Sequence, residues 1–243
     1  MDPILKAAQI LKDHPPAIAL TGAGISVDSG IPDFRSAQGL WARYDPMEYA
    51  TLSAFRKHPD KVWRMLHDME ALVVGAEPNA GHHALAELEE LGVLKGVVTQ
   101  NIDGLHQAAG SSRVVEFHGG ADRLVCSCGY TVAAADAPRD PVPCCPQCGG
   151  VLKPDIVFFG EAIPADALRQ AFRLASEAQV VLVVGTSATV SPAAEVPVLA
   201  RQSGAQLIEF NVERTALSDL CDVCVTGRAA RTLPAVVEAL RAR

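Results

Sequence analysis

Polar loops that follow apolar segments carry the residues of this chain that are best suited to bind a nucleotide. Residues 17–21 form a short apolar run that leads into Gly22-Ala23-Gly24-Ile25-Ser26 and then into Gly30-Ile31-Pro32-Asp33-Phe34-Arg35. Such a loop offers backbone N–H groups, a hydroxyl and a guanidinium, all of which suit phosphates. The G-x-G-x-x-G dinucleotide pattern is incomplete because Val27 stands at its third glycine, so a plain tight turn remains an alternative.

A second set of polar residues stands at the ends of three other apolar runs. Gln100, Asn101 and Asp103 follow residues 96–99 and are able to hydrogen-bond a ribose and a carboxamide. Ligands of open α/β sheets bind beyond the carboxyl ends of the strands, which favours this function. A helix N-cap by Asn101 or Asp103 is the alternative. Two more runs end in residues that would suit the adenosine half of a dinucleotide, namely Gly185-Thr186-Ser187 and Asn211.

His118 is the candidate general base. It follows the apolar run Val114–Phe117 and precedes Gly119-Gly120, which places an imidazole at a strand end beside a glycine-rich corner. An imidazole titrates close to neutral pH and suits proton transfer there. A purely structural role is the alternative. We interpret the other six histidines as structural, and they are His14, His58, His67, His82, His83 and His106.

Five of the seven cysteines lie between residues 126 and 148. The pairs Cys126-x-Cys128 and Cys145-Pro-Gln-Cys148 predict a tetrahedral Cys₄ zinc site with a closed, structural ligand shell. The C-x-C spacing of the first pair is unusual, Cys144 is an alternative to Cys145, and free thiols are an alternative to zinc. The remaining pair has no partner pair, and we interpret it as two small buried hydrophobic residues, Cys221 and Cys224.

Composition limits the class of protein. The 243 residues are 49% hydrophobic, which excludes a disordered chain, and a net charge of −7 argues against direct nucleic-acid binding. No stretch approaches the roughly 20 apolar residues that span a bilayer, and the first residues do not resemble a signal peptide. Together with reduced, metal-binding thiols, these features predict a cytoplasmic protein without a membrane segment.

Buried-strand patterns alternate with amphipathic helix patterns along most of the chain. This alternation predicts an α/β fold with a doubly wound, Rossmann-like parallel sheet covered by helices on both faces. Two stretches interrupt it, and together they would form a smaller lobe. We expect a Rossmann-like domain from residues 1–35, 76–118 and 156–243, a helical insertion at 36–75 and a zinc-ribbon insertion at 119–155.

Taken together, these motifs resemble the sirtuin (Sir2) family of NAD-dependent protein deacylases. The glycine-rich loops, the Thr99–Asp103 segment, His118-Gly119 and the two cysteine pairs occur in the family's order. So do Lys153–Glu161, Gly185–Ser187 and Asn211, and the resemblance covers nearly the whole chain.

The resemblance implies a role for each matching residue. His118 and Asn101 would be the catalytic residues, with His118 as the general base. One structural Zn²⁺ would be held by Cys126, Cys128, Cys145 and Cys148. NAD, consumed as a co-substrate, would be bound by Gly22, Ala23, Gly24, Ser26, Asp33, Phe34, Arg35, Gln100, Asn101, Ile102, Asp103, Gly185, Thr186, Ser187 and Asn211. Acyl-lysine proteins would be the partners, and a substrate peptide would add as a strand along Val157, Phe158, Gly160 and Glu161.

The implied function is NAD-dependent protein-lysine deacetylation that releases nicotinamide and O-acetyl-ADP-ribose. Relatives that remove succinyl or malonyl groups carry a Tyr and an Arg three residues apart on the helix after a Phe-x-x-x-Pro-x-x-Val-Trp-like segment. Here Leu66 and Met69 stand at those positions, which predicts an apolar acyl pocket, and Arg64 is expected to point elsewhere. Mono-ADP-ribosyl transfer to protein and a non-catalytic zinc- or nucleotide-binding module are the alternatives. The presence of His118, Asn101 and Asp103 argues against an inactive module.

Overall fold

The computed structural model describes residues 2–34, 36 and 39–242. Its larger sheet has six parallel strands in the order β3-β2-β1-β7-β8-β9. The order reverses on either side of β1, which is the doubly wound arrangement expected from the sequence. The strands are β1 (Ala17–Thr21), β2 (Leu94–Thr99), β3 (Val114–Glu116), β7 (Val180–Val184), β8 (Gln206–Asn211) and β9 (Val223–Thr226).

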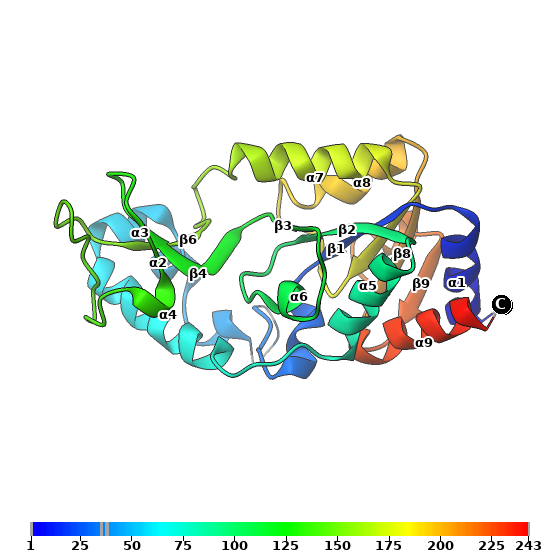
Figure 1. Ribbon diagram of the computed structural model, residues 1–243, viewed down its shortest axis with the longest axis horizontal. Helices are drawn as coiled ribbons and strands as arrows, with labels where there is room; N and C mark the ends of the chain where they lie inside the picture. Colours follow the sequence, from blue (N-terminus) through cyan, green and yellow to red (C-terminus); the bar gives the residue numbers. More distant parts are fainter. Residues whose placement is uncertain (1, 35, 37–38, 243) are drawn as a thin grey trace.

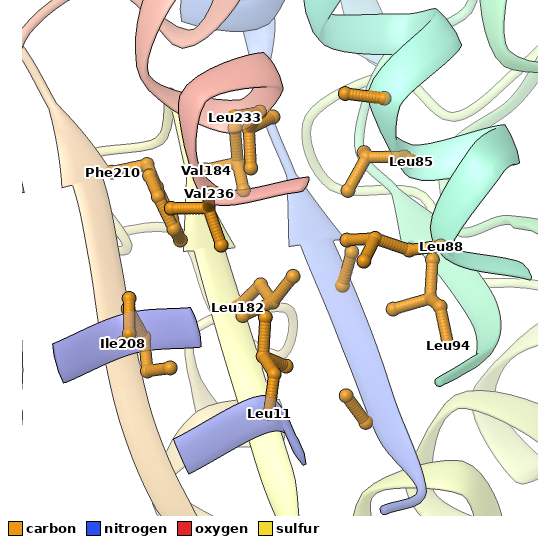
Figure 2. Packing of buried hydrophobic residues seen from close by; sticks show 14 of the residues in the cluster. Leu11, Leu85, Leu88, Leu94, Leu182, Val184, Ile208, Phe210, Leu233 and Val236 are labelled. Carbon is orange, nitrogen blue, oxygen red and sulfur yellow. The ribbon is translucent and has the colours of Figure 1, made fainter. Parts of the chain in front are cut away.

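Helices cover both faces of this sheet (Figure 1). One face packs against α1 (Pro3–Asp13), α5 (Ala80–Glu90) and α9 (Ala229–Arg241), and the other packs against α7 (Ala165–Glu177) and α8 (Glu195–Gln202). The central strands β1 and β7 are buried at every residue, as their uninterrupted apolar sequences require. Figure 2 shows the first core, where Leu11, Leu85 and Leu233 reach the sheet from the three helices. The short helix α6 (Leu105–Ala108) follows β2.

A smaller lobe lies at one end of the sheet (Figure 1). It contains an antiparallel sheet in the order β5-β4-β6, formed by β4 (Gly119–Val125), β5 (Thr131–Ala133) and β6 (Lys153–Ile156). The helices α2 (Pro46–Tyr49), α3 (Leu52–Lys57) and α4 (Pro59–Val73) accompany it. This lobe has its own apolar core, which includes Phe55, Trp63, Leu124, Leu152 and Phe158. The expected fold class, a doubly wound sheet with a smaller lobe of helices and a cysteine-rich ribbon, is confirmed.

No helix in the described part of the chain is long and apolar enough to cross a membrane.

Candidate active site

The loops after β1 and β7 cross in close contact at the carboxyl end of the sheet. Gly24 donates a backbone hydrogen bond to the carbonyl oxygen of Gly185 over 2.8 Å. A Cβ on Gly24 would lie 2.7 Å from the Cα of Gly185, and one on Gly22 would lie 2.7 Å from the Cβ of Thr186. Contacts this short leave no room for a side chain. Glycine at positions 22 and 24 is therefore required by the packing of the two loops, in addition to any ligand that they bind.

Ser26, Asn101 and Asp103 form a hydrogen-bonded group between the loops after β1 and β2. The Asn101 amide donates to the Ser26 hydroxyl over 3.1 Å, and that hydroxyl donates to the Asp103 carboxylate over 2.7 Å. The other Asp103 oxygen accepts from the backbone N–H of Leu105 at 3.0 Å, at the start of α6. The N-cap residue of α6 is Gly104, so the alternative of an N-cap by Asn101 or Asp103 is wrong, and Asp103 belongs to the polar group. Asn101 is buried, so its orientation is fixed by these contacts.

Gln100, Thr186 and Asn211 connect the ends of β2, β7 and β8. The Gln100 amide donates to the Thr186 hydroxyl over 2.9 Å. The Asn211 amide donates to the Thr186 carbonyl oxygen over 3.0 Å. Polar groups from three strands are therefore held side by side at one edge of the sheet, where open α/β sheets bind their ligands.

His118 lies where β3 leads into β4. Its Nδ1 is 3.0 Å from the carbonyl oxygen of Gln100, which can only accept a hydrogen bond. Nδ1 therefore carries the proton, and Nε2 has the free lone pair. Burial lowers the pKa of His118, so the ring is neutral at physiological pH. A neutral imidazole with a free Nε2 is able to accept a proton, as a general base must.

These residues surround one large cavity of about 840 Å³. Its described lining includes fifteen of the residues predicted to be functional, and they are Gly22, Ala23, Gly24, Asp33, Phe34, Gln100, Asn101, Ile102, His118, Gly185, Thr186, Ser187, Asn211, Leu66 and Met69. All four residues of the predicted peptide edge line it too, namely Val157, Phe158, Gly160 and Glu161. Ser26 and Asp103 line a smaller adjoining hollow, which shares Ala23 and Asn101 with the cavity. Arg35 lies outside the described residues.

Some residues of the cavity wall were not identified from the sequence. They are Trp41, Met65, Phe159, Val190–Pro192, Val212–Ala216 and Gly227–Ala229, among others. Two of these segments directly follow β8 and β9, so their position beyond strand ends was a signal that could have found them. Trp41, Met65 and Phe159 reach the cavity from the smaller lobe, and no local pattern predicts this.

One wall of the cavity is apolar and is formed by α4. Met65, Leu66 and Met69 line the cavity from this helix. The side chain of Arg64 is 75% exposed and is paired with Asp60 at 3.7 Å, so it points away from the cavity as expected. Successive helical residues project about 100° apart, which explains why Arg64 and Met65 face in different directions.

The predicted peptide edge continues from β6. The backbone N–H of Val157 donates to the His118 carbonyl oxygen over 2.9 Å, which holds this segment beside the candidate base. Glu161 accepts from the Phe158 backbone N–H at 3.1 Å and pairs with Lys153 at 3.0 Å. Its carboxylate therefore has a structural function in shaping the edge.

The four cysteines of the smaller lobe converge on one point. The ligand atoms of Cys126, Cys128, Cys145 and Cys148 all lie within 4.8 Å of one another. The sulfurs of Cys126 and Cys148 are 3.5 Å apart, and those of Cys128 and Cys145 are 3.7 Å apart. Four sulfurs around one tetrahedral zinc are about 3.8 Å apart, so this group fits a structural Zn²⁺. The backbone N–H of Cys128 lowers the pKa of the Cys126 thiol, which favours the thiolate that a metal needs.

Cys144 lies outside this group. It forms an antiparallel bridge with Val151, its side chain is exposed, and its sulfur contacts the Val142 carbonyl oxygen at 3.6 Å. Neighbouring residues of an extended segment point to opposite sides, so Cys144 and Cys145 do not both face the cluster.

Two of the histidines interpreted as structural lie beneath the loops of the site. His106 is 1% exposed, and its Nε2 lies 2.9 Å from the Thr21 hydroxyl. His82 is fully buried in the capping box of α5, and its ring lies 5.0 Å from that of His106. Burial lowers the pKa of His82 to about 4 and that of His106 to about 3, so both are uncharged at neutral pH.

A doubly wound sheet with a buried neutral imidazole and a wall of amide and hydroxyl groups at its carboxyl edge defines a dinucleotide-binding α/β enzyme. A family model described as the Sir2 family matches residues 22–192. The chain belongs to the Sir2 family.

Similar proteins with known names or structures agree with this assignment. The NAD-dependent protein deacylase 2 of Pyrobaculum aerophilum is 47% identical over 241 residues, covering 98% of this chain and 96% of the relative. A solved Sir2 homolog–NAD complex is 42% identical with a TM-score of 0.92, covering 98% of this chain and 93% of the other. Sir2Af2 bound to a myristoylated histone peptide is 39% identical with a TM-score of 0.85, covering 99% of this chain and 97% of that one.

Proposed function

We propose that this chain, as an NAD-dependent protein deacylase of the Sir2 family, removes acetyl and longer apolar acyl groups from lysine side chains and discriminates against succinyl and malonyl groups. Family membership supports the NAD-dependent reaction. The observation that carries the acyl preference is the apolar wall that Met65, Leu66 and Met69 contribute to the cavity.

The donors and acceptors around the cavity fit NAD. A volume of about 840 Å³ is at the upper end of ordinary ligand sites, as a dinucleotide together with an acyl-lysine requires. Gln100 and Asn101 would bind the nicotinamide ribose, Asp103 the carboxamide, and Thr186 and Asn211 the adenosine half. When bound, NAD supplies a sugar that accepts the acyl group after nicotinamide has left, and we propose nicotinamide and O-acetyl-ADP-ribose as the products.

His118 would accept a proton through Nε2. Its Nδ1 is committed to the Gln100 carbonyl oxygen at 3.0 Å, so the ring is held in one tautomer and one orientation. Asn101, which is fixed through Ser26, would keep the ribose in place. Proton transfer by a positioned imidazole accelerates reactions by roughly 10²–10⁴-fold.

The substrate lysine would enter beside Val157–Glu161. This segment lines the cavity, and the Val157 N–H is bonded to the His118 carbonyl oxygen, so a peptide strand paired with it lies next to the base. Strand addition gives main-chain affinity with modest sequence specificity, which suits an enzyme that recognises a modified lysine in several proteins. The related structure with a myristoylated histone peptide supports a protein substrate with an apolar acyl chain.

An acidic acyl chain would meet no partner at the α4 wall. Leu66 is 7% exposed, and neither Leu66 nor Met69 is able to donate a hydrogen bond to a carboxylate. Burying an unpaired carboxylate costs several kcal/mol, and each 1.4 kcal/mol corresponds to tenfold in an equilibrium or rate. We therefore expect acetyl to exceed succinyl by roughly 100-fold or more in kcat/KM.

The test uses matched acetyl-, butyryl- and succinyl-lysine peptides with and without NAD, followed by mass spectrometry of both peptide and nucleotide products. Free lysine peptide and O-acyl-ADP-ribose that form only with NAD support deacylation. A peptide that gains the mass of ADP-ribose would instead identify mono-ADP-ribosyl transfer. Equal turnover of succinyl and acetyl peptides would contradict the apolar acyl pocket.

A further inference from the structure

A second group of metal-ligating side chains lies far along the chain from the cysteine ribbon. The ligand atoms of Glu209, Cys221 and Cys224 lie within 4.8 Å of one another. Glu209 in β8 is directly paired with Cys224 in β9, and Cys221 follows the short turn Ser218–Leu220. None of the three is among the described residues that line the large cavity. The sequence suggested that Cys221 and Cys224 are two small buried hydrophobic residues. In the structure both are half-buried and lie beside the Glu209 carboxylate.

Glu209 is a buried carboxyl group without a basic partner in the described part of the chain. It is 2% exposed, and its two oxygens accept hydrogen bonds from the hydroxyls of Thr215 and Ser218. No basic side chain in the described part of the chain forms an ion pair with it. The nearby Arg214 is paired with Asp219 at 2.5 Å instead. Buried carboxylates in proteins are normally paired with a cation or coordinate a metal, which makes the Glu209 carboxylate a candidate metal ligand.

The thiols of Cys221 and Cys224 are the other two candidate metal ligands beside Glu209. The Cys221 sulfur lies 3.3 Å from the Leu217 carbonyl oxygen, and the Cys224 sulfur lies 3.5 Å from that of Ser218. Together with the Glu209 carboxylate, they give the group three ligand atoms within 4.8 Å of one another.

We propose that Glu209, Cys221 and Cys224 bind a thiophilic divalent cation, for which Zn²⁺ fits best. Two thiolates and one carboxylate are ligands that zinc accepts, and the Ser218 carbonyl oxygen is placed to be the fourth. Binding releases two thiol protons to solvent, so the net charge of the group does not change, and it places the cation directly against the Glu209 carboxylate.

The number of zinc ions bound per chain tests this site, measured on the intact protein with zinc already bound by the four ribbon cysteines. The chain is incubated with excess Zn²⁺, passed through a desalting column and analysed for zinc per chain. We expect two zinc ions in the wild type and one in the double variant Cys221→Ser/Cys224→Ser. Cys144→Ser is the matched control, because this exposed thiol lies outside both groups, and it should keep both ions.

Cadmium gives an independent readout. Replacing zinc by Cd²⁺ produces thiolate-to-metal absorption, and the double variant should lose about one third of it, since two of six metal-bound thiolates are removed. Glu209→Gln keeps one acceptor oxygen for the Thr215 and Ser218 hydroxyls and removes the carboxylate, so it should weaken binding of the second ion without affecting the first. A wild type that saturates at one zinc, or a folded double variant that retains two, overturns the proposal.

Discussion

The Nδ1 atom of His118 lies 3.0 Å from the carbonyl oxygen of Gln100, and this contact decides which ring nitrogen is available for chemistry. Gln100 also donates through its side chain to Thr186, so one residue orients the base and connects it to the neighbouring strand end. The arrangement depends on β2 and β3 being adjacent parallel strands, because this pairing brings residues 100 and 118 together.

Replacing His118 by alanine should affect catalysis far more than cofactor binding. We expect His118→Ala to lower kcat for deacetylation by roughly 10²–10⁴-fold, whereas the Kd for NAD should change little, since the imidazole acts after NAD is bound. Steady-state kinetics and calorimetric NAD titration measure the two effects. His83→Ala is the control, because His83 is exposed on α5 and should leave both quantities unchanged. Near-native turnover of His118→Ala would remove His118 from the mechanism.

Acid should destabilise the fold through the buried histidines. The pKa of His106 is about 3 in the folded chain and near 6.5 when unfolded, so the unfolded state binds more protons between these values. This contribution to stability is complete above about pH 6.5 and decreases by up to ~1.4 kcal/mol per pH unit as the pH falls. Denaturant unfolding at several pH values should give a shallower slope for His106→Gln than for the wild type. Identical slopes would show that His106 is not the group that titrates.

Loss of zinc should unfold the smaller lobe first. The Trp63 indole donates to the Leu152 carbonyl oxygen over 3.1 Å within that lobe's core, so Trp63 fluorescence reports on its packing. In a Trp41→Phe background, we expect a chelator or Cys126→Ser to shift this fluorescence and to lower stability by several kcal/mol. Cys144→Ser should retain one ribbon zinc and normal fluorescence. A Cys126→Ser protein that keeps this zinc would contradict the ligand set.

Substitutions in the α4 wall should weaken the preference for acetyl over succinyl groups. Leu66→Tyr combined with Met69→Arg introduces a hydroxyl and a guanidinium into the cavity, which would pair with a succinyl carboxylate. We expect the acetyl-to-succinyl ratio of kcat/KM to fall by about tenfold or more, consistent with one charge-assisted pair. Met47→Arg adds the same charge on a side chain that is 71% exposed, and it should not change the ratio. An unchanged ratio in the double variant would place the acyl chain elsewhere.

The sequence by itself determined the elements and the family, because these depend on local patterns. Uninterrupted apolar runs such as Val180–Val184 predict strands buried on both faces, and polar residues placed directly after them mark the ligand-binding edge. The cysteine spacing likewise predicted a metal-binding ribbon, and the order of the motifs identified the Sir2 family.

Only the tertiary structure decided which neighbours these residues have. It brings Cys145 rather than Cys144 into the cysteine group, because alternate residues of an extended segment face opposite sides. It directs Met65 into a cavity that is also lined by Gly185–Ser187 and Asn211, which are more than 100 residues away in the sequence. It also pairs β8 with β9, so that Glu209 lies beside Cys224 on the neighbouring strand. The separate sequence patterns of the two strands contain no information about this register.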